Sequence, residues 1–395
     1  MATSGNFVQL HNHTHYSLLD GASKIPDLVK RAKELNMPAV GITDHGNMHG
    51  AYEMWSTAVK EGVKPIIGIE AYVTPETARQ DQTRVSWDTN WNPDIDPQHR
   101  RRNPNDVSGG GLITHLTMWA ETDEGLVNLM KASTDANLEG RVMRYPRMDK
   151  EILAKYSKGI IASSGCPSGI IQTRLLLGQF DEALRAAGEL QDIFGRDNFY
   201  IEFMDHGLKI EKQVTDGLLD IAKKLNAPLL ATNDSHYVRA EDAGSQDAML
   251  CINSGSTLDE PGRFKFDGTG YYLKSAEEMR ELFKDIPEAC DNTLEIAERC
   301  NVMFDDHEDG AFMPQFDCPE GWDETSLFLR KVEEGLEQRY DGHPPIEVLK
   351  QADYECGVIC QMQFCGYFLV VADYINWAKS HGVMVGPGRG SAAGS

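Results

Sequence analysis

The sequence has no run of about eighteen consecutive apolar residues, so it offers no candidate for an ordinary membrane-spanning helix. Its first residues, MATSGNFVQL, lack the basic and apolar regions of a secretory signal peptide. Its 8 cysteines are scattered through 395 residues, unlike the disulfide framework of a small secreted protein. These absences favour a globular protein of the reducing cytoplasm with no membrane partner.

Basic residues are also scarce. The chain has 38 Lys and Arg against 61 Asp and Glu, a formal net charge of −23 at pH 7. A field of this sign opposes broad, nonspecific adhesion to nucleic acid. Local contact is still allowed, because bound cations and small basic patches such as the arginine run at 100–102 can reverse the field. Taken alone, that run is interpreted as a solvated loop.

Short apolar runs typical of β-strands alternate with amphipathic helical patterns up to about residue 240. Seven strand–helix units in series predict an α/β fold of parallel strands and crossover helices, closed into a distorted (β/α)7 barrel. An open doubly wound sheet is the structural alternative. The predicted strands are 7–10, 38–43, 64–73, 112–120, 158–164, 198–203 and 227–232.

Two segments depart from this alternation. Residues 77–111 are polar and rich in Pro, Asn, Asp and Gly, which predicts a long, mobile surface excursion between the third and fourth units. After about residue 285 the patterns are mostly helical and end in a glycine-rich stretch. We therefore expect a first domain over 1–285 and a second, mostly helical domain over 286–395.

Residues able to bind metal ions follow most of the predicted strands at their carboxyl ends. Residues two apart on a strand face the same way, so His11 and His13 form one pair and Asp234 and His236 another. The carboxyl ends of parallel strands share one mouth of a barrel; only His115 lies early in its strand. The predicted set is His11, His13, Asp20, His45, Glu70, His115, Cys166, Asp234 and His236.

Nine such groups exceed the needs of one tetrahedral ion and suit two or three ions, with a carboxylate such as Glu70 bridging a pair. Imidazoles and a thiolate favour zinc over magnesium, with manganese and iron as alternatives. Each residue alone is more simply a capped or surface group, but their joint positions predict a metal centre. Such a centre suits phosphate ester hydrolysis, because cations neutralise phosphoryl oxygens and lower the pKa of a bound water to about 7. No Ser–His–Asp arrangement competes with it.

These motifs resemble the PHP (polymerase and histidinol phosphatase) domain, a distorted seven-unit barrel with up to three metal ions. The stretches FVQLHNHTHYSLLDGA, AVGITDHGNMHGA, KPIIGIEAYV, ATNDSHY and GYFLVVADYINWAKSHGVMVGPGRGSAAGS extend the resemblance over essentially the whole chain. Together they are similar to the N-terminal part of the alpha-subunit family of bacterial replicative DNA polymerase III, the C-family polymerases. Within it, the chain resembles the branch whose PHP domain is an active 3′–5′ proofreading exonuclease.

The resemblance implies how the ligands divide among the ions. One ion would be held by His11, His13, Glu70 and Asp234. The second would be held by Glu70, His115 and Cys166, and the third by Asp20, His45 and His236. Asp20, Glu70 and Asp234 would be catalytic, and the substrate would be the 3′ end of a DNA primer-template.

The resemblance also implies that the second domain is the start of a nucleotidyltransferase-like palm. Gly388, Arg389, Gly390 and Ser391 would contact an incoming deoxynucleoside triphosphate, since such a loop exposes backbone N–H groups to phosphate. Magnesium would serve the polymerase site of the full-length protein, and the sliding clamp and other replisome subunits would bind mostly through other regions. The family's catalytic aspartates are absent from this sequence, so the fragment is not expected to polymerise DNA.

Several residues have open interpretations. His15 falls outside the ligand pattern and is predicted to lie on the surface, whereas Asp44 is predicted to orient a ligand. Glu202 and His206 either contact the substrate phosphate or cap a strand end. Packing is favoured over a zinc site for Cys356, Cys360 and Cys365.

Two functional alternatives remain. A small-molecule phosphoesterase similar to histidinol phosphatase would share the barrel and the metals but would leave the last hundred residues unexplained. A metal-stabilised scaffold that docks the palm and partner subunits would have no nuclease activity.

Overall fold

The computed structural model describes residues 6–88, 103, 105–305, 314–386 and 388. The chain divides into two compact units, Met1–Phe304 and Asp305–Ser395. The division lies beyond the boundary expected near residue 285, because helix α10 (Pro287–Arg299) packs against strand β8 (Leu229–Ala231) of the first unit. Asn292 Nδ2 of α10 donates to the Leu229 carbonyl of β8 at 2.7 Å, and Thr293 Oγ1 accepts from the N–H of Val8, in the first segment of the chain, at 3.1 Å.

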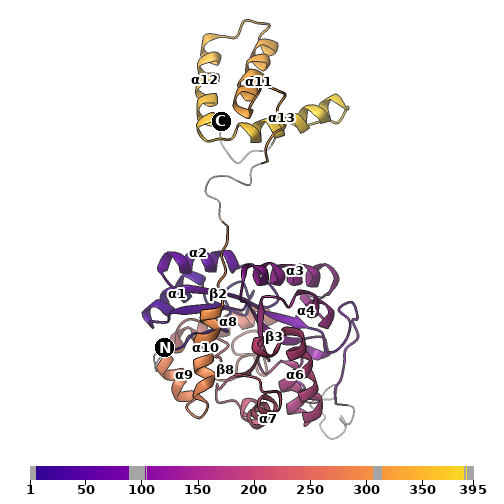
Figure 1. Ribbon diagram of the computed structural model, residues 1–395, viewed down its shortest axis with the longest axis vertical. Helices are drawn as coiled ribbons and strands as arrows, with labels where there is room; N and C mark the ends of the chain where they lie inside the picture. The colour runs from indigo at the N-terminus through magenta and orange to yellow at the C-terminus, as the bar shows by residue number, and fades with distance from the viewer. Residues whose placement is uncertain (1–5, 89–102, 104, 306–313, 387, 389–395) are drawn as a thin grey trace. The chain divides into compact units, whose positions relative to one another are not determined.

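The first unit combines one mixed sheet with helices on its outer side, as Figure 1 shows. Its other strands are β1 (Ala39–Ile42), β2 (Lys64–Val73), β3 (Thr114–Ala120), β4 (Arg141–Val142), β5 (Tyr145–Met148), β6 (Ile160–Ser163) and β7 (Phe199–Phe203). Its other helices are α1 (Ile25–Glu34), α2 (Ala51–Glu61), α3 (Asp123–Glu139), α4 (Lys150–Tyr156), α5 (Ile170–Leu176), α6 (Phe180–Phe194), α7 (Lys209–Leu225), α8 (Ala243–Ser254) and α9 (Ala276–Leu282). Three short 3₁₀ turns are also described: η2 (Gly109–Gly111), η3 (Arg196–Asn198) and η4 (Ala240–Asp242).

The strands close into a ring. The sheet runs β2–β3–β6–β7–β8, and β1 pairs in parallel with β2. The extended segment at the start of the chain closes the gap: Gln9 forms a parallel bridge with Val40 of β1, and Asn12 forms one with Ser235 just after β8. This arrangement agrees with the distorted barrel expected from the sequence, although the first predicted strand, 7–10, is held by isolated bridges.

The expectation of uniformly parallel strands was wrong at β3. This strand runs antiparallel to both β2 and β6. The described residues between β2 and β3 include no α-helix, and a strand that does not follow a crossover helix need not return in the parallel sense. The first residues of β3 therefore lie at the same edge of the sheet as the last residues of its neighbours, and this edge is where the candidate site forms.

The core of the first unit is formed by the apolar residues of the strands and by the apolar faces of amphipathic helices. Ile66, Ile67 and Ile69 of β2 are fully buried, as is Trp119 of β3. Helix α1 begins with a proline in its first turn and turns Leu28 and other apolar residues inward. This wall of buried side chains holds the strand ends in fixed positions.

A short hairpin, β4–β5, was not predicted. It follows α3 and adds to β2 through β5. The buried guanidinium of Arg147 on β5 donates from Nη2 to the carbonyls of Arg79, at 2.6 Å, and Asp81, at 2.8 Å. The hairpin thus anchors the described beginning of the 77–111 excursion; residues 89–102, which include the arginine run at 100–102, and residue 104 lie outside the described part.

The second unit contains α11 (Glu324–Arg339), α12 (Ile346–Gln361) and α13 (Cys365–Ser380). Among its described residues, the buried hydrophobic ones are few: Leu327, Phe328, Cys365 and Leu369. Large apolar side chains such as Tyr354 and Trp377 are 68% and 60% exposed. Among the described residues no single helix could span a membrane; α12 and α13 meet the length and composition test only as a pair bent by 114°.

Candidate metal centre

Two pairs of ligand-type residues lie side by side because of the bridge that closes the ring. The His13 N–H donates to the Ser235 carbonyl at 2.7 Å, and the Ser235 N–H donates to the His11 carbonyl at 3.1 Å. The two histidines are therefore adjacent to Asp234 and His236. Asp234 adopts a positive φ of 44°, a left-handed conformation that Asp and Asn tolerate better than most residues.

Glu70, in the middle of β2, lies at the centre of the cluster and is fully buried. Its Oε2 lies 2.7 Å from His45 Nδ1 and 3.3 Å from His13 Nε2. Its Oε1 lies 3.1 Å from His115 Nδ1 and 3.6 Å from His11 Nε2. A single carboxylate thus faces four imidazoles, which is the geometry that a bridging ligand needs.

The antiparallel direction of β3 explains His115, the exception in the sequence pattern. Its register places His115 opposite Tyr72 at the end of β2. The loop after β6 brings Cys166 Sγ to 3.3 Å from His115 Nδ1. His115, Cys166 and Glu70 therefore lie together, as the family resemblance implied.

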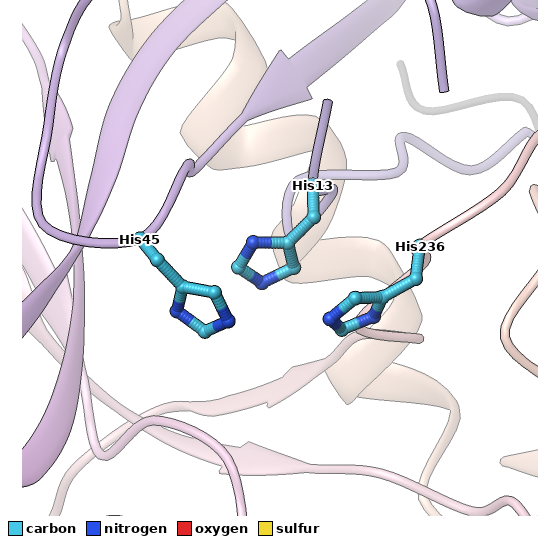
Figure 2. Close-up of side chains that lie close together, drawn as sticks. All are labelled: His13, His45 and His236. Carbon is cyan, nitrogen blue, oxygen red and sulfur yellow. The ribbon is translucent and has the colours of Figure 1, made fainter. Parts of the chain in front are cut away.

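The third group lies on the other side of Glu70. His45 Nε2 is 3.0 Å from Asp20 Oδ2. The rings of His13 and His236 stack at 4.3 Å, and those of His13 and His45 lie 4.1 Å apart. Figure 2 shows these three imidazoles turned toward one another from three separate segments. All nine residues predicted from the sequence are thus brought to one site.

The cluster contains buried polar atoms that have no hydrogen-bond partner among the described residues. His45 Nδ1 and Glu70 Oε2 are as close as a hydrogen bond, but their geometry does not form one. Buried polar atoms normally have partners, so donor atoms that share a centre without bonding one another fit a cation. The unpartnered atoms in the cluster are His11 Nε2, His13 Nε2, Asp20 Oδ1, His45 Nδ1, Glu70 Oε2 and Asp234 Oδ1.

Hydrogen bonds behind the cluster orient the ring of His13. His13 Nδ1 pairs with Ser17 Oγ at 2.9 Å, and Ser17 Oγ donates to Asp44 Oδ1 at 2.7 Å. The Asp44 carboxylate also accepts from the Thr14 N–H at 2.7 Å. Asp44 therefore orients a ligand through Ser17, in line with the sequence prediction. Ser17 itself was missed, since a lone serine four residues after a histidine carries no recognisable signal.

Two parts of the chain match known protein families. Residues 9–206, about half of the chain, match the family described as the PHP domain. The chain belongs to the PHP domain family. We call Met1–Phe304, which contains this match, the PHP unit. Residues 326–395 match the family described as the bacterial DNA polymerase III alpha NTPase domain.

Relatives align with the whole chain, PHP unit included. DNA polymerase III subunit alpha of Mycobacterium tuberculosis is 51% identical over 100% of this chain and 32% of its own length. The subunit of Treponema pallidum is 40% identical over 99% of this chain and 31% of its own. The chain thus spans about a third of the length of these curated relatives. A solved amidohydrolase from Chromobacterium violaceum is 15% identical over 59% of this chain and 88% of its own, with a TM-score of 0.34, too low to support an argument.

We call the nine residues of the candidate metal site the PHP cluster. Burial and mutual contacts shift the pKa values of several of these residues. Burial opposes a charge on His11, but Asp234 and other carboxylates outweigh it and raise the pKa of this imidazole well above its ordinary value. Burial likewise opposes a charge on Glu70, but facing imidazoles, that of His115 first, hold the pKa of the carboxyl well below its usual range. Without a cation, charged rings and carboxylates stabilise one another.

In two other members of the PHP cluster, the pKa is shifted in the direction that favours the neutral form. Burial and the neighbouring His13 lower the pKa of His236 to about 4, so this ring is neutral and ready to bind a cation at pH 7. Burial, followed by the charge of Glu70, raises the pKa of the Cys166 thiol well above its ordinary value. A bound zinc ion reverses this effect, because a coordinating thiol loses its proton.

The structure does not place Glu202 and His206 at the substrate, as one interpretation of the sequence had it. Glu202 is buried behind the PHP cluster, and its Oε1 accepts from His11 Nδ1 at 2.7 Å. Both ring nitrogens of His206 are engaged, with Glu211 Oε1 at 2.6 Å and the Asn233 carbonyl at 2.8 Å. Neither side chain has a free polar atom facing the cluster.

The remaining residues lie outside the PHP cluster. His15 is only half-buried and stacks on Tyr16 at 4.3 Å, and it belongs to none of the potential ligand groups among the described residues. Of the predicted nucleotide loop, Gly388 is described with a φ of 85°, whereas residues 389–391 lie outside the described part. Cys356, Cys360 and Cys365 pack in the small core of the second unit, and the Sγ atoms of the last two lie 3.6 Å apart.

Proposed function

We propose that the PHP unit binds two or three metal ions, with zinc favoured, and hydrolyses phosphodiester bonds at the 3′ end of DNA. The activity would be that of a proofreading 3′–5′ exonuclease in DNA replication. The observation that carries this proposal is the convergence of buried, unpartnered ring nitrogens and carboxylate oxygens on Glu70. The identity to DNA polymerase III subunit alpha, 51% over the whole chain, directs the choice of substrate toward DNA.

The division of ligands among the ions is the one that the family resemblance implies: His11, His13 and Asp234 with Glu70 for one ion, and His115 and Cys166 with Glu70 for another. In support, Asp234 Oδ1 lies 3.4 Å from His11 Nε2 and 3.1 Å from His13 Nε2, and Cys166 Sγ lies 3.3 Å from His115 Nδ1. His45, Asp20 and His236 form the third group, with manganese or iron as alternatives to zinc. Bound cations supply charge neutralisation at the phosphoryl group and a water of lowered pKa.

The chain's own residues position this chemistry. Glu202 and Ser17 each fix a ring through its Nδ1 atom, so that the Nε2 atoms of His11 and His13 face inward. Asp20, Glu70 and Asp234 are the proposed catalytic carboxylates. They would balance the positive charge of the bound cations.

In the whole protein of which the relatives are examples, we propose DNA synthesis in the cytoplasm from deoxynucleoside triphosphates. Magnesium would serve that site, and the sliding clamp and other replisome subunits would be partners. Residues 326–395, which match the NTPase domain of that family, would contribute Gly388, Arg389, Gly390 and Ser391 to nucleotide binding.

The test uses the variants Asp20→Asn and Asp234→Asn. Asn tolerates the positive φ of residue 234, so the second variant removes charge without straining the backbone. We expect each to reduce cleavage of a mismatched primer by more than about hundredfold while the fold is kept, checked by circular dichroism and by metal analysis of the purified chain.

The competing functions predict different results. A small-molecule phosphoesterase would turn over histidinol phosphate faster than a mismatched primer. A scaffold would show no cleavage in the wild type for either variant to remove. If either Asn variant cleaves the primer at the wild-type rate, the site assignment is wrong.

A further inference from the structure

A cleft of about 390 Å³ opens beside the metal cluster. It is lined by Asp20 and His45, which belong to the cluster, and also by Arg141 and Arg144. The volume lies within the range of about 300–1,000 Å³ that is typical of sites for small molecules. It therefore suits one nucleotide of a strand better than a paired duplex.

The unpredicted hairpin carries these two arginines to the cleft. Residues 143 and 144 form the turn between β4 and β5, and Met143 has a φ of 55°. The Arg144 guanidinium is held by two neighbours: it donates to Asn253 Oδ1 of α8 at 2.8 Å and lies 5.3 Å from the centre of the Tyr145 ring. Its position is thus set by contacts on both sides.

Both arginines are exposed cations without an ion-pair partner in the described part of the chain. Two other arginines outside helices, Arg239 and Arg263, instead pair with Glu34 and Asp247 at 2.8 and 2.5 Å. The neighbouring Tyr145 side chain first, and the charge of Asp20 to a smaller degree, raise the pKa of the Arg144 guanidinium, so this side chain is fully charged. Two unpaired guanidiniums facing a cleft form a ready site for phosphate oxygens.

We infer that this cleft binds the phosphodiester next to the one hydrolysed at the cluster, so that the substrate is a single-stranded nucleic-acid end. The inference rests on the proposed function and deepens it. A monophosphate ester needs only the phosphate site that the cluster supplies. A second phosphate site fits a substrate with at least two phosphates, and a nucleic-acid strand is the substrate of this kind that agrees with the proposed function. Leu18 and Leu19, 75% and 41% exposed on the same cleft, offer an apolar surface to a base.

The first test measures binding without cleavage. The full chain is titrated with a fluorescent single-stranded oligonucleotide in the presence of chelator, and anisotropy is followed at several salt concentrations. We expect Arg141→Gln with Arg144→Gln to weaken binding about tenfold, equally for different base sequences. The salt dependence should fall by about 0.7 in log–log slope for each arginine removed.

Arg196→Gln is the matched control, because Arg196 lines a different cavity, at the amino-terminal ends of the strands. It should bind the oligonucleotide as the wild type does. If the double variant retains wild-type affinity and salt slope, or if Arg196→Gln weakens binding as much, the inference is overturned.

The second test separates this subsite from the cluster. Steady-state rates are compared for a single-stranded oligonucleotide and for bis(p-nitrophenyl) phosphate, a phosphodiester with no second phosphate. We expect the double variant to raise KM for DNA with little change in kcat, and to lower the preference for DNA over the small diester about tenfold. An equal loss on both substrates would overturn the inference. A wild type that cleaves neither substrate would refute the proposed function, and anisotropy would still decide whether the subsite exists.

Discussion

Two buried histidine–glutamate pairs in the PHP unit have similar geometry, but only one of them lies at the candidate metal site. In one, His11 Nδ1 lies 2.7 Å from Glu202 Oε1; in the other, His206 Nδ1 lies 2.6 Å from Glu211 Oε1. The difference is at the second ring nitrogen. His206 Nε2 bonds the Asn233 carbonyl at 2.8 Å, whereas His11 Nε2 has no hydrogen-bond partner in the described structure and faces Glu70 and Asp234.

The comparison teaches what distinguishes a ligand from a structural histidine. A carboxylate on Nδ1 fixes the orientation of the ring in both pairs. Only a second nitrogen left without a partner, in a group of similarly unpartnered atoms, makes the residue available to a cation. Burial and an acidic neighbour do not suffice.

The largest expected effect comes from replacing the two histidines in turn. His11→Gln should lose more than about hundredfold in cleavage, together with bound metal, because a ligand is removed. His206→Gln should keep its metal and its rate but lose about 1–3 kcal/mol of unfolding free energy, because two buried hydrogen bonds are broken. Metal analysis, single-turnover rates and denaturant titration measure these quantities. Equal metal loss in both variants would remove the distinction.

The next effect comes from the carboxylates behind the rings. Glu202→Gln should weaken metal binding by about 10–100-fold, since the orienting charge on His11 is lost. Glu211→Gln, the matched change at the other pair, should leave metal affinity unaltered. Competition with a chromophoric chelator measures both affinities, and a comparable loss in the two variants would argue against the role assigned to Glu202.

A third prediction is that stability depends on pH with opposite signs in the presence and in the absence of metal. In chelator, the raised pKa of His11 means that its charged form is stabilised by the fold; this stabilisation is present below about pH 6.5 and is lost as pH rises through the raised pKa. With metal, the ring must be neutral, so its contribution to stability rises with pH below about pH 6.5, where the ring of the unfolded chain is still protonated, and is level above that pH. The expected slope is up to about 1.4 kcal/mol per pH unit for one proton. Melting curves between pH 5 and 8 measure it, and curves of the same sign in both conditions would contradict it.

The smallest effect is expected in the second unit. Cys360→Ser should leave the metal content unchanged and cost less than about 1.5 kcal/mol, because Cys360 is only partly buried and packs as a small apolar group. Cys166→Ser should lower metal occupancy at the PHP cluster. Metal analysis of the two variants side by side tests this, and metal loss in Cys360→Ser would indicate a site in the helical unit.

Much of the fold could be predicted from the hydrophobic pattern of the sequence. Strands with buried apolar runs, such as β2, were placed closely, since the run is long and bounded by a helix and a polar loop. The hairpin β4–β5 was missed because its strands are short and mostly polar. The direction of β3 was also missed, since an apolar run has no direction until its neighbours are known.

The residues of the candidate site, like the elements of the fold, could be predicted only in part from the sequence. All nine ligand-type residues could be picked out from the sequence, because side-chain chemistry and position after a strand are local properties. The partners of those residues could not: Ser17 supports His13, Glu202 supports His11, and Arg144 faces the cleft only through the turn that carries it.

The amino-acid sequence by itself determined the kinds of ligand, their order along the barrel, and the composition of the two units. Tertiary structure alone decided which nitrogen of each histidine is free, which glutamate lies behind a ring, and where unpaired cations meet the cluster. The physical reason is distance: hydrogen bonds and charges act over a few ångströms, between residues that are tens to hundreds of positions apart, and only the closed ring of strands brings them within reach.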